Sequence, residues 1–457
     1  MSTTLNSGID PASFSAVTGP AQDLFRYVNG PWIDMYRLPD DRSRYGSFDK
    51  LAEDAENQIR EILEDDDCPA EKSHALYASF LDVDAINASG LAAIEDQLKA
   101  IDVAADKAGA GRAARVNDRA ARGSGASGGV HDLIGIAVYG DPGAPETNII
   151  HIEQSGLGLP DEAYYREDHY APIREAYVDM VAKQLKNAKL AADDEQAEAQ
   201  AQRFLDVETR IAANHWDNVA TRDSVKTYNP TDYAELSGIL ADYDLDTWIE
   251  SWQSAYDQTS AAQVQPLDFR GIFNHVVVHE PSFLTGLNAF WKAADLDDLK
   301  LWARVHVIIG STLELPHEFD ETNFEFYGKT LSGQKQQRVR WKRGVSLVNG
   351  ICGEDVGREY VKRHFPESSK QRMEQLVGNL IDAYRVSISN SAWLGEETKQ
   401  KALEKLSKFV PKIGYTNHWR DYSALDVREN AGFAENMRAA NLYETGYQLA
   451  KVGKSVD

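Results

Sequence analysis

Two His-Glu pairs are the first residues in this sequence that suggest metal chemistry. They are His279-Glu280 and His317-Glu318. A catalytic zinc site of the His-Glu-x-x-His kind needs two imidazoles four residues apart on one helical face, with the glutamate beside them to polarise the bound water. Pro281 breaks a helix after the first pair, and Glu321 stands where the second pair needs its other histidine. Neither pair therefore completes a zinc site.

His275 and His279 are also four residues apart, in the segment HVVVH. The three β-branched valines between them favour an extended chain, in which the two Cα atoms lie about 13 Å apart. We therefore expect an ordinary strand with two surface or capped histidines, and no zinc ligation.

A G-x-S-x-G pattern, which can mark a nucleophilic serine, spans Gly125–Gly129 and precedes His131 and Asp132. Such a serine needs a buried strand that leads into a tight turn and a helix. The preceding segment NDRAARGS is polar and is no buried strand. The pattern favours a flexible connection at residues 123–129.

Two charged clusters also fall short of a site. The alternating acids of Asp242–Asp246 begin like a calcium loop, but Thr247 and Gln253 replace the glycine and the bidentate glutamate that such a loop needs. We expect surface acids that cap a helix. The basic run at residues 335–343 lies in an acidic chain and favours internal ion pairs over a nucleic-acid site. Spacing alone thus gives no complete catalytic constellation.

The overall charge excludes some partners. The chain has 48 Lys plus Arg and 72 Asp plus Glu, a net charge of −24, which repels nucleic acid and anionic membrane surfaces. Two cysteines, Cys68 and Cys352, are too few for a disulfide framework. The first residues show no secretory pattern, and no stretch approaches the roughly 18 apolar residues of a spanning helix. We expect a cytoplasmic protein.

Helical patterns dominate the chain. They occupy residues 173–190, 195–216, 369–388 and 396–409. In the third pattern, a buried helix face is predicted from Met373, Leu376, Val377, Leu380, Ile381 and Tyr384. One β-hairpin is predicted within residues 135–156. The fold class is therefore mainly α with minor β.

Several segments, taken together in their order along the chain, indicate a resemblance to a known family. They are FRYVNGPW (25–32), DRSRYGSF (41–48), SGLGLPDEAYY (155–165), ETRIAANHWDNVATRDSVKTYNP (208–230), FYGKTLSGQKQQRVRWKR (326–343), WLGEETKQKALEKLSKFVPKIGY (393–415) and NLYETGYQLAKVGK (441–454). From about residue 22 to its end, the chain resembles the neprilysin-like zinc metallopeptidases of the M13 family, especially bacterial oligoendopeptidase O.

The resemblance implies a large helical lid-type lobe that closes over a thermolysin-like catalytic lobe, around a chamber that admits peptides. It divides the chain into a mobile N-terminus (1–21), a segment that packs on the catalytic lobe (22–50), a mainly helical lid domain (51–395) and the start of a return toward the absent catalytic lobe (396–457).

Family members continue into a His-Glu-x-x-His helix with further zinc ligands, and this chain has none of these motifs. We therefore expect the N-terminal portion of a metalloendopeptidase, a fragment that is inactive alone. Zinc belongs to the complete family enzyme and is not expected on this chain. The implied partners are peptide substrates and the missing catalytic half. The alternative is a non-catalytic helical peptide-binding or interaction module.

One site residue follows from the resemblance. Arg44 occupies the Arg-Tyr-Gly motif, whose arginine lies on the primed side of the family's cleft and helps to bind peptide. A guanidinium offers a planar fork of donors to carboxylate or carbonyl oxygens. The alternative is a structural arginine paired with a nearby acid. A second arginine that assists in neprilysin is Ala52 here, which weakens any assignment of C-terminal carboxylate recognition. No catalytic and no metal-binding residue is predicted.

Overall fold

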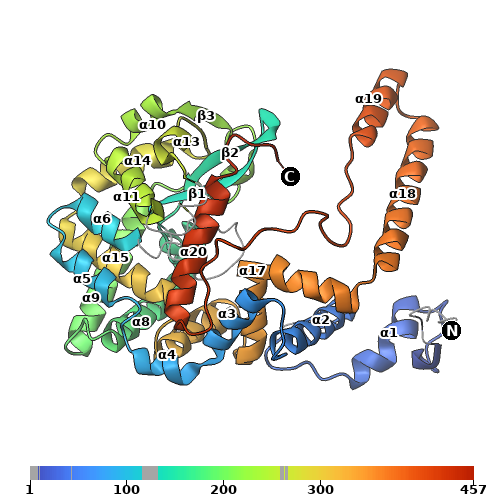
Figure 1. Ribbon diagram of the computed structural model, residues 1–457, viewed down its shortest axis with the longest axis horizontal. Coiled ribbons are helices and arrows are strands. Elements are labelled where there is room, and N and C mark those ends of the chain that lie inside the picture. The colour runs from blue at the N-terminus through green and yellow to red at the C-terminus, as the bar shows by residue number, and fades with distance from the viewer. Residues whose placement is uncertain are drawn as a thin grey trace.

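The computed structural model describes residues 9, 11–42, 44–115, 132–257, 262 and 266–456. Figure 1 shows a large helical body and a separate helical hairpin that stands off to its right. The helices are α1 (Leu24–Met35), α2 (Ser47–Leu63), α3 (Glu71–Leu81), α4 (Val83–Ser89), α5 (Glu95–Val103), α6 (Lys107–Arg115), α7 (Ala163–Arg166), α8 (Ala171–Asn187), α9 (Asp194–Ala212), α10 (Tyr233–Ile239), α11 (Leu245–Asp257), α13 (Phe269–Ile272), α14 (Pro281–Ala293), α15 (Leu296–Gly310), α16 (His317–Asn323), α17 (Arg340–His364), α18 (Glu367–Ser389), α19 (Glu396–Ser407) and α20 (Phe433–Leu449). Short 3-10 helices lie at η1 (Pro11–Ser13), η2 (Asp168–Tyr170) and η3 (Ala220–Arg222), and η4 (Phe324–Leu331) is a π-helix.

The acidic composition contributes directly to helix formation. Several helices begin at an aspartate whose carboxylate accepts a backbone N–H of the first turn, which satisfies a donor that the helix itself leaves free. These N-caps are Asp23, Asp82, Asp193, Asp232 and Asp268.

A small sheet lies within the body, in the order β1-β2-β4-β3. The strands β1 (Ile134–Asp141) and β2 (Ala144–Gln154) form an antiparallel hairpin, which confirms the hairpin predicted within residues 135–156. β4 (His275–Val278) runs parallel to β2, and β3 (Asn229–Asp232) pairs antiparallel with β4. The segment HVVVH is thus a strand, as its valines predicted. The fold is mainly α with minor β, as expected.

Two hydrophobic clusters hold the body together. The first packs the sheet against α8, α9, α11, α14 and α15, and the second joins α2, α3, α17 and the start of α20. Met437 near the start of α20 belongs to the second cluster, whereas Leu449 at its end belongs to the first. α20 therefore spans both clusters.

The π-helix η4 contacts the loop after β2. Tyr327 within η4 donates its hydroxyl hydrogen to the backbone oxygen of Gly158, at 3.0 Å. A π-helix closes hydrogen bonds between residues five apart, so its side chains are spaced differently from those of an α-helix.

The predicted helices at residues 173–190, 195–216, 369–388 and 396–409 are confirmed as α8, α9, α18 and α19. The last two form the separate hairpin of Figure 1, and we call residues 367–407 the arm. No helix among the described residues is long and apolar enough to cross a membrane. The four domain boundaries drawn from the resemblance stay a prediction.

The predicted buried face of α18 is wrong. Neither α18 nor α19 contains a buried residue. Four residues of the apolar stripe are exposed by 44 to 63%: Met373, Leu376, Leu380 and Tyr384. The helical periodicity is correct, but an apolar stripe shows only that a helix has a face to cover, and among the described residues this face is only half-buried, at Val377 and Ile381.

Candidate functional site

Arg44 lies on the extended segment between α1 and α2 and is exposed. Next to it, Tyr45 stacks on Tyr36 with ring centroids 4.7 Å apart, and Tyr36 stacks on Trp32 at 4.8 Å. Among the described residues, no acid forms an ion pair with Arg44. The peptide-binding role of Arg44 and its alternative as a structural arginine both stay predictions.

Residues on both sides of Arg44 fix the segment. Arg42 lies 3.6 Å from the carboxylate of Glu53, and the Tyr45 hydroxyl donates to the same carboxylate at 3.2 Å. Lys342 also donates to Glu53, at 2.8 Å, and this hydrogen bond is the main reason that the pKa of Glu53 lies below its usual value. A shared acid thus anchors the neighbours of Arg44.

The basic run at residues 335–343 forms internal ion pairs, as expected. Besides Lys342, Arg338 binds Glu56 at 2.5 Å and Arg343 binds Asp320 at 2.8 Å. These pairs tie the start of α17 to α2 and α16.

The acids of Asp242–Asp246 also behave as expected. Asp244 accepts the backbone N–H and the hydroxyl of Thr247 at the start of α11, and Asp242 pairs with Lys292 at 3.1 Å. The G-x-S-x-G pattern at Gly125–Gly129 and His131 lie outside the described residues.

The histidines of HVVVH point to different surroundings. His275 is exposed, whereas His279 meets His151 of β2, with Nε2 of His279 2.9 Å from Nδ1 of His151. The hydroxyl of Tyr139 lies 3.1 Å from the same Nε2 and donates to Glu153 at 2.9 Å. The two imidazole ring centroids are 5.2 Å apart, the separation of rings that meet nitrogen to nitrogen. This arrangement is a hydrogen bond between imidazoles, with no space for an ion between them.

Burial sets the protonation of this cluster. Burial, followed by the nearby His279, lowers the pKa of His151 to about 4, and burial also lowers the pKa of His279. Burial raises the pKa of the adjacent Glu280 to about 7. Both imidazoles are therefore neutral near pH 7, and Glu280 is partly protonated there.

The described residues do not fit a zinc site. Among them, no three His, Cys, Asp or Glu side chains lie close enough together to hold a metal ion. Structural and catalytic zinc sites need at least three protein ligands. No reaction step through zinc is therefore assigned to these residues.

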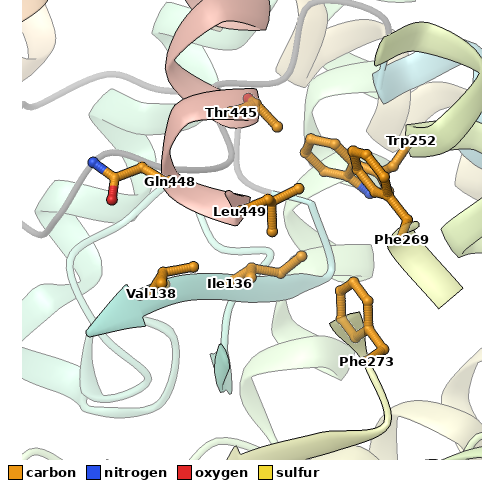
Figure 2. A pocket seen from close by; sticks show the side chains of 9 residues that line it. Ile136, Val138, Trp252, Phe269, Phe273, Thr445, Gln448 and Leu449 are labelled. Carbon is orange, nitrogen blue, oxygen red and sulfur yellow. The ribbon is translucent and has the colours of Figure 1, made fainter. Parts of the chain in front are cut away.

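A small apolar pocket lies between β1 and the end of α20 (Figure 2). Ile136, Val138 and Leu449 face it, and the indole of Trp252 lies on its other side. Nε1 of Trp252 is buried without a hydrogen-bond partner. The cavity is about 10 Å³, which is room for about one water molecule, so it does not hold a peptide.

A buried carboxylate connects three of the motifs that define the family resemblance. Glu208 is fully buried and accepts the backbone N–H of Gly158 at 2.9 Å and the hydroxyl of Tyr165 at 2.7 Å. His306 lies 2.9 Å from the same side chain, and Tyr327 binds the oxygen of Gly158. Sequence analysis missed this network because Tyr165 lies 43 residues and His306 lies 98 residues from Glu208 along the chain. No local pattern links residues so far apart.

The sequence between residues 20 and 416 matches the N-terminal model of peptidase family M13. The chain therefore belongs to peptidase family M13, in its N-terminal region. The predicted family is confirmed.

Known relatives agree with this assignment. Human neprilysin is 26% identical over 97% of this chain and 61% of its own length. The zinc metalloprotease Zmp1 of Mycobacterium tuberculosis, in complex with an inhibitor, is 35% identical, with a TM-score of 0.83 over 99% of this chain and 66% of the Zmp1 chain. The same enzyme in its open state gives a TM-score of 0.78 at 34% identity, over 96% of this chain and 66% of its own. The chain thus spans about three fifths to two thirds of the length of these relatives.

Proposed function

We propose that this chain forms the lid and chamber wall of an M13-like zinc metalloendopeptidase that acts on peptides. Membership of the M13 family supports the reaction class, and the similar Zmp1 is a zinc metalloprotease. In this proposal the zinc ligands belong to a catalytic half that these residues do not contain. The chain alone is then inactive.

The observation that carries the proposal is the uneven distribution of exposed apolar side chains. Large ones gather on the arm and on the N-terminal helices α1 and α2. Their exposed fractions include 63% for Phe25, 76% for Met35, 86% for Phe48 and 85% for Trp393. Apolar surface of this kind, in contrast to a body with two buried clusters, marks an interaction face. We propose that the catalytic lobe covers it.

Arg44 is proposed to bind peptide on the side of the cleft that follows the cut bond. Its exposed guanidinium has no acid partner among the described residues, so its donors are available to carbonyl or carboxylate oxygens. Because Ala52 offers no second cation, we expect peptides with free and with amidated C-termini to bind about equally. A cytoplasmic location in bacteria stays a prediction.

The reaction assignment is tested with internally quenched peptides and added zinc. We expect no cleavage by the purified chain alone, and chelator-sensitive cleavage after a separately produced M13 catalytic half is added. Chelator-sensitive cleavage by the chain alone would contradict the proposal that the zinc ligands belong to a separate catalytic half.

The role of Arg44 is tested in the same reconstituted mixture. Arg44→Ala is expected to raise KM about tenfold, the cost of one charge-assisted contact of about 1.5 kcal/mol. Arg37→Ala is the matched control, because Arg37 is an exposed arginine on the same connection. Equal effects of the two substitutions would reduce Arg44 to a surface charge.

A non-catalytic interaction module is the other outcome. It predicts that peptides bind the chain alone with the same affinity before and after a catalytic half is added, and that no mixture cleaves them. Calorimetric titration with the same peptides separates this outcome from the peptidase assignment.

A further inference from the structure

A larger pocket opens on the surface of the body, where α9 and α15 lie next to the end of α5. In Figure 1 these helices lie on the left side of the body, and the arm stands off to its right. The pocket has a volume of about 620 Å³, against about 10 Å³ for the space in Figure 2. Pockets that hold small molecules measure about 300–1,000 Å³, so this one is large enough to bind a ligand.

Two helix faces form the walls of this pocket. The lining residues from α9 are Gln196, Ala199, Gln200 and Arg203, and those from α15 are Asp297, Leu301 and Arg304. Within each helix these residues follow one another at the spacing of side chains that share one helical face. Leu301 is only 3% exposed and forms an apolar floor, whereas the methyl group of Ala199 leaves the space open. The pocket thus combines an apolar floor with charged walls.

Arg203 is held at the pocket by an ion pair. Its Nε donates to Asp298 at 2.6 Å, and Arg210 donates to the other oxygen of the same carboxylate, also at 2.6 Å. Burial alone would raise the pKa of Asp298, but these hydrogen bonds keep it below its usual value, so the carboxylate is ionised near pH 7. A guanidinium has five N–H donors, and Arg203 uses only one of them in hydrogen bonds with the described residues. Its other donors are available to a ligand.

Arg304 is oriented in a similar way on the other helix. Its Nε and one of its terminal nitrogens contact Asp102 near the end of α5, at 2.7 and 2.6 Å. Lys300 donates to the backbone oxygen of Asp102 at 2.8 Å. The side-chain oxygen of Gln196 accepts a backbone N–H at 2.7 Å, which leaves its NH₂ group to donate. In the described part of the chain, Arg203, Arg304 and Gln196 therefore keep donors that no other residue uses.

The charge around the pocket is opposite to that of the whole chain. The charged lining residues, with the charged residues joined to them by hydrogen bonds, are the cations Arg203, Arg210, Lys300 and Arg304 and the acids Asp102, Asp297 and Asp298. The chain as a whole has a net charge of −24, but exposed charges farther away than about 8 Å are largely screened at physiological ionic strength. The local excess of cations therefore favours an anionic ligand.

A pocket between α8 and η4 has the opposite chemistry. It has a volume of about 450 Å³ and is lined by Asp179, Glu321 and Glu325, and Lys183 is the one lysine or arginine among the described residues that line it. This pocket repels an anion, so the two pockets together should bind one anion per chain.

We propose that the pocket between α9 and α15 binds a small organic anion with two carboxylate groups, one on Arg203 and one on Arg304. Guanidinium groups bind carboxylates through paired N–H donors, and two such groups on different helices favour a ligand with two anionic ends. The apolar floor at Leu301 favours a hydrocarbon link between those ends over an inorganic ion. The inference concerns the body of this chain and does not depend on the proposed peptidase activity.

The test is calorimetric titration of the full chain with glutarate, a short dicarboxylate, at low ionic strength. We expect saturable binding of one glutarate per chain, with an affinity that falls as salt is added. Its neutral diamide, glutaramide, should not bind, and inorganic phosphate should bind at least tenfold more weakly than glutarate. The proposal is overturned if glutarate shows no saturable binding, or if phosphate or glutaramide binds as tightly.

Arg203→Gln and Arg210→Gln form a matched pair of variants. Both arginines contact Asp298 at 2.6 Å, and their side chains are 49% and 46% exposed, but of the two only Arg203 lines the pocket. Arg203→Gln should weaken glutarate binding at least tenfold, whereas Arg210→Gln should weaken it less than threefold. Equal weakening would show a general effect of surface charge and contradict the proposed site.

Ala199→Trp tests the pocket without removing a charge. Ala199 is exposed on α9, so the helix can carry a larger side chain there, and the indole fills the space that the ligand needs. Glutarate binding should be lost, while the circular dichroism and the melting temperature of the free chain stay at wild-type values. Wild-type affinity in this variant would mean that glutarate binds elsewhere on the chain, which also overturns the proposal.

Discussion

The body and the arm are built from helices with similar apolar stripes, but they use those stripes differently. In the body, Leu76 of α3 is fully buried, whereas Leu376 of α18 in the arm is 50% exposed. The two positions carry the same amino acid at the same kind of helical position. The comparison teaches that periodicity predicts which face of a helix is apolar, whereas the rest of the fold decides whether that face is covered.

The largest expected difference between the body and the arm is in the unfolding free energy that is lost when a glutamate is replaced by alanine. Glu208→Ala leaves the backbone N–H of Gly158, the hydroxyl of Tyr165 and the imidazole of His306 without their buried acceptor, which we expect to cost about 3–5 kcal/mol of unfolding free energy. The matched arm substitution Glu404→Ala breaks an exposed pair with Lys408 and should leave the unfolding free energy unchanged within the error of the measurement. Urea unfolding measures both, and similar values would remove the distinction.

The second-largest expected difference is between the alanine substitutions of Leu76 and Leu376. Leu76→Ala opens a cavity in the second cluster and is expected to cost about 2–5 kcal/mol. Leu376→Ala should change the stability by less than about 0.5 kcal/mol, because half of the side chain is already in water. Adding a catalytic half should make Leu376→Ala costly for association. If Leu376→Ala alone destabilises the chain as strongly as Leu76→Ala, the arm is packed in solution.

A smaller effect depends on pH. The folded-state pKa of Glu280 is about 7 against a usual value of 4.5, so the folded state binds more protons between these values, and stability falls as pH rises from 4.5 to 7. Glu280→Gln should remove this loss. The unfolding free energy of the variant relative to the wild type should therefore be higher at pH 8 than at pH 5, by on the order of 1–3 kcal/mol. Glu374→Gln on the exposed surface of α18 is the control and should keep the wild-type pH profile.

His151 acts in the opposite direction. Its folded-state pKa of about 4 lies below the usual 6.5, so stability is lost as pH falls from 6.5 toward 4. The Glu280→Gln variant should therefore retain its acid-side loss. A profile that becomes flat on both sides would show that the two groups titrate as one.

The smallest effect concerns the cavity beneath α20. Val138→Ile adds one methylene beside a space of about 10 Å³ and should stabilise the chain by at most about 0.8 kcal/mol, measured by thermal unfolding. Val386→Ile in the arm adds the same group at a 60% exposed position and should have no measurable effect. A loss of stability at Val138 would mean that the cavity wall cannot adapt.

Much of the fold follows from local sequence. The hairpin at residues 134–154, the strand at His275–Val278 and the long helices have clear periodicity, and the structure places them where the pattern predicts. The basic run at residues 335–343 also forms the internal ion pairs that its sequence predicts. Short-range patterns are reliable here because strand and helix periods depend on neighbouring residues alone.

The rest required contacts between distant residues. The hydrogen bond between His151 and His279 joins residues 128 positions apart, and nothing near either histidine predicts the other. The burial of α18 was mispredicted for the same reason. Its periodicity identifies an apolar face, but it does not show whether another part of the protein covers that face. Arg44 could be chosen only through the family resemblance, since its local sequence fits a surface arginine equally well.

The π-helix η4 has a consequence for sequence length. Its wider turns accommodate more residues than an α-helix over the same path, so deleting one residue from Phe324–Leu331 would let this stretch relax into ordinary α geometry. The deletion would be taken up within the stretch, whose side chains would change from the π spacing to the α spacing. A deletion placed just before Tyr327 would therefore change the direction of its side chain, and the loop after β2 would lose its hydrogen bond to this helix.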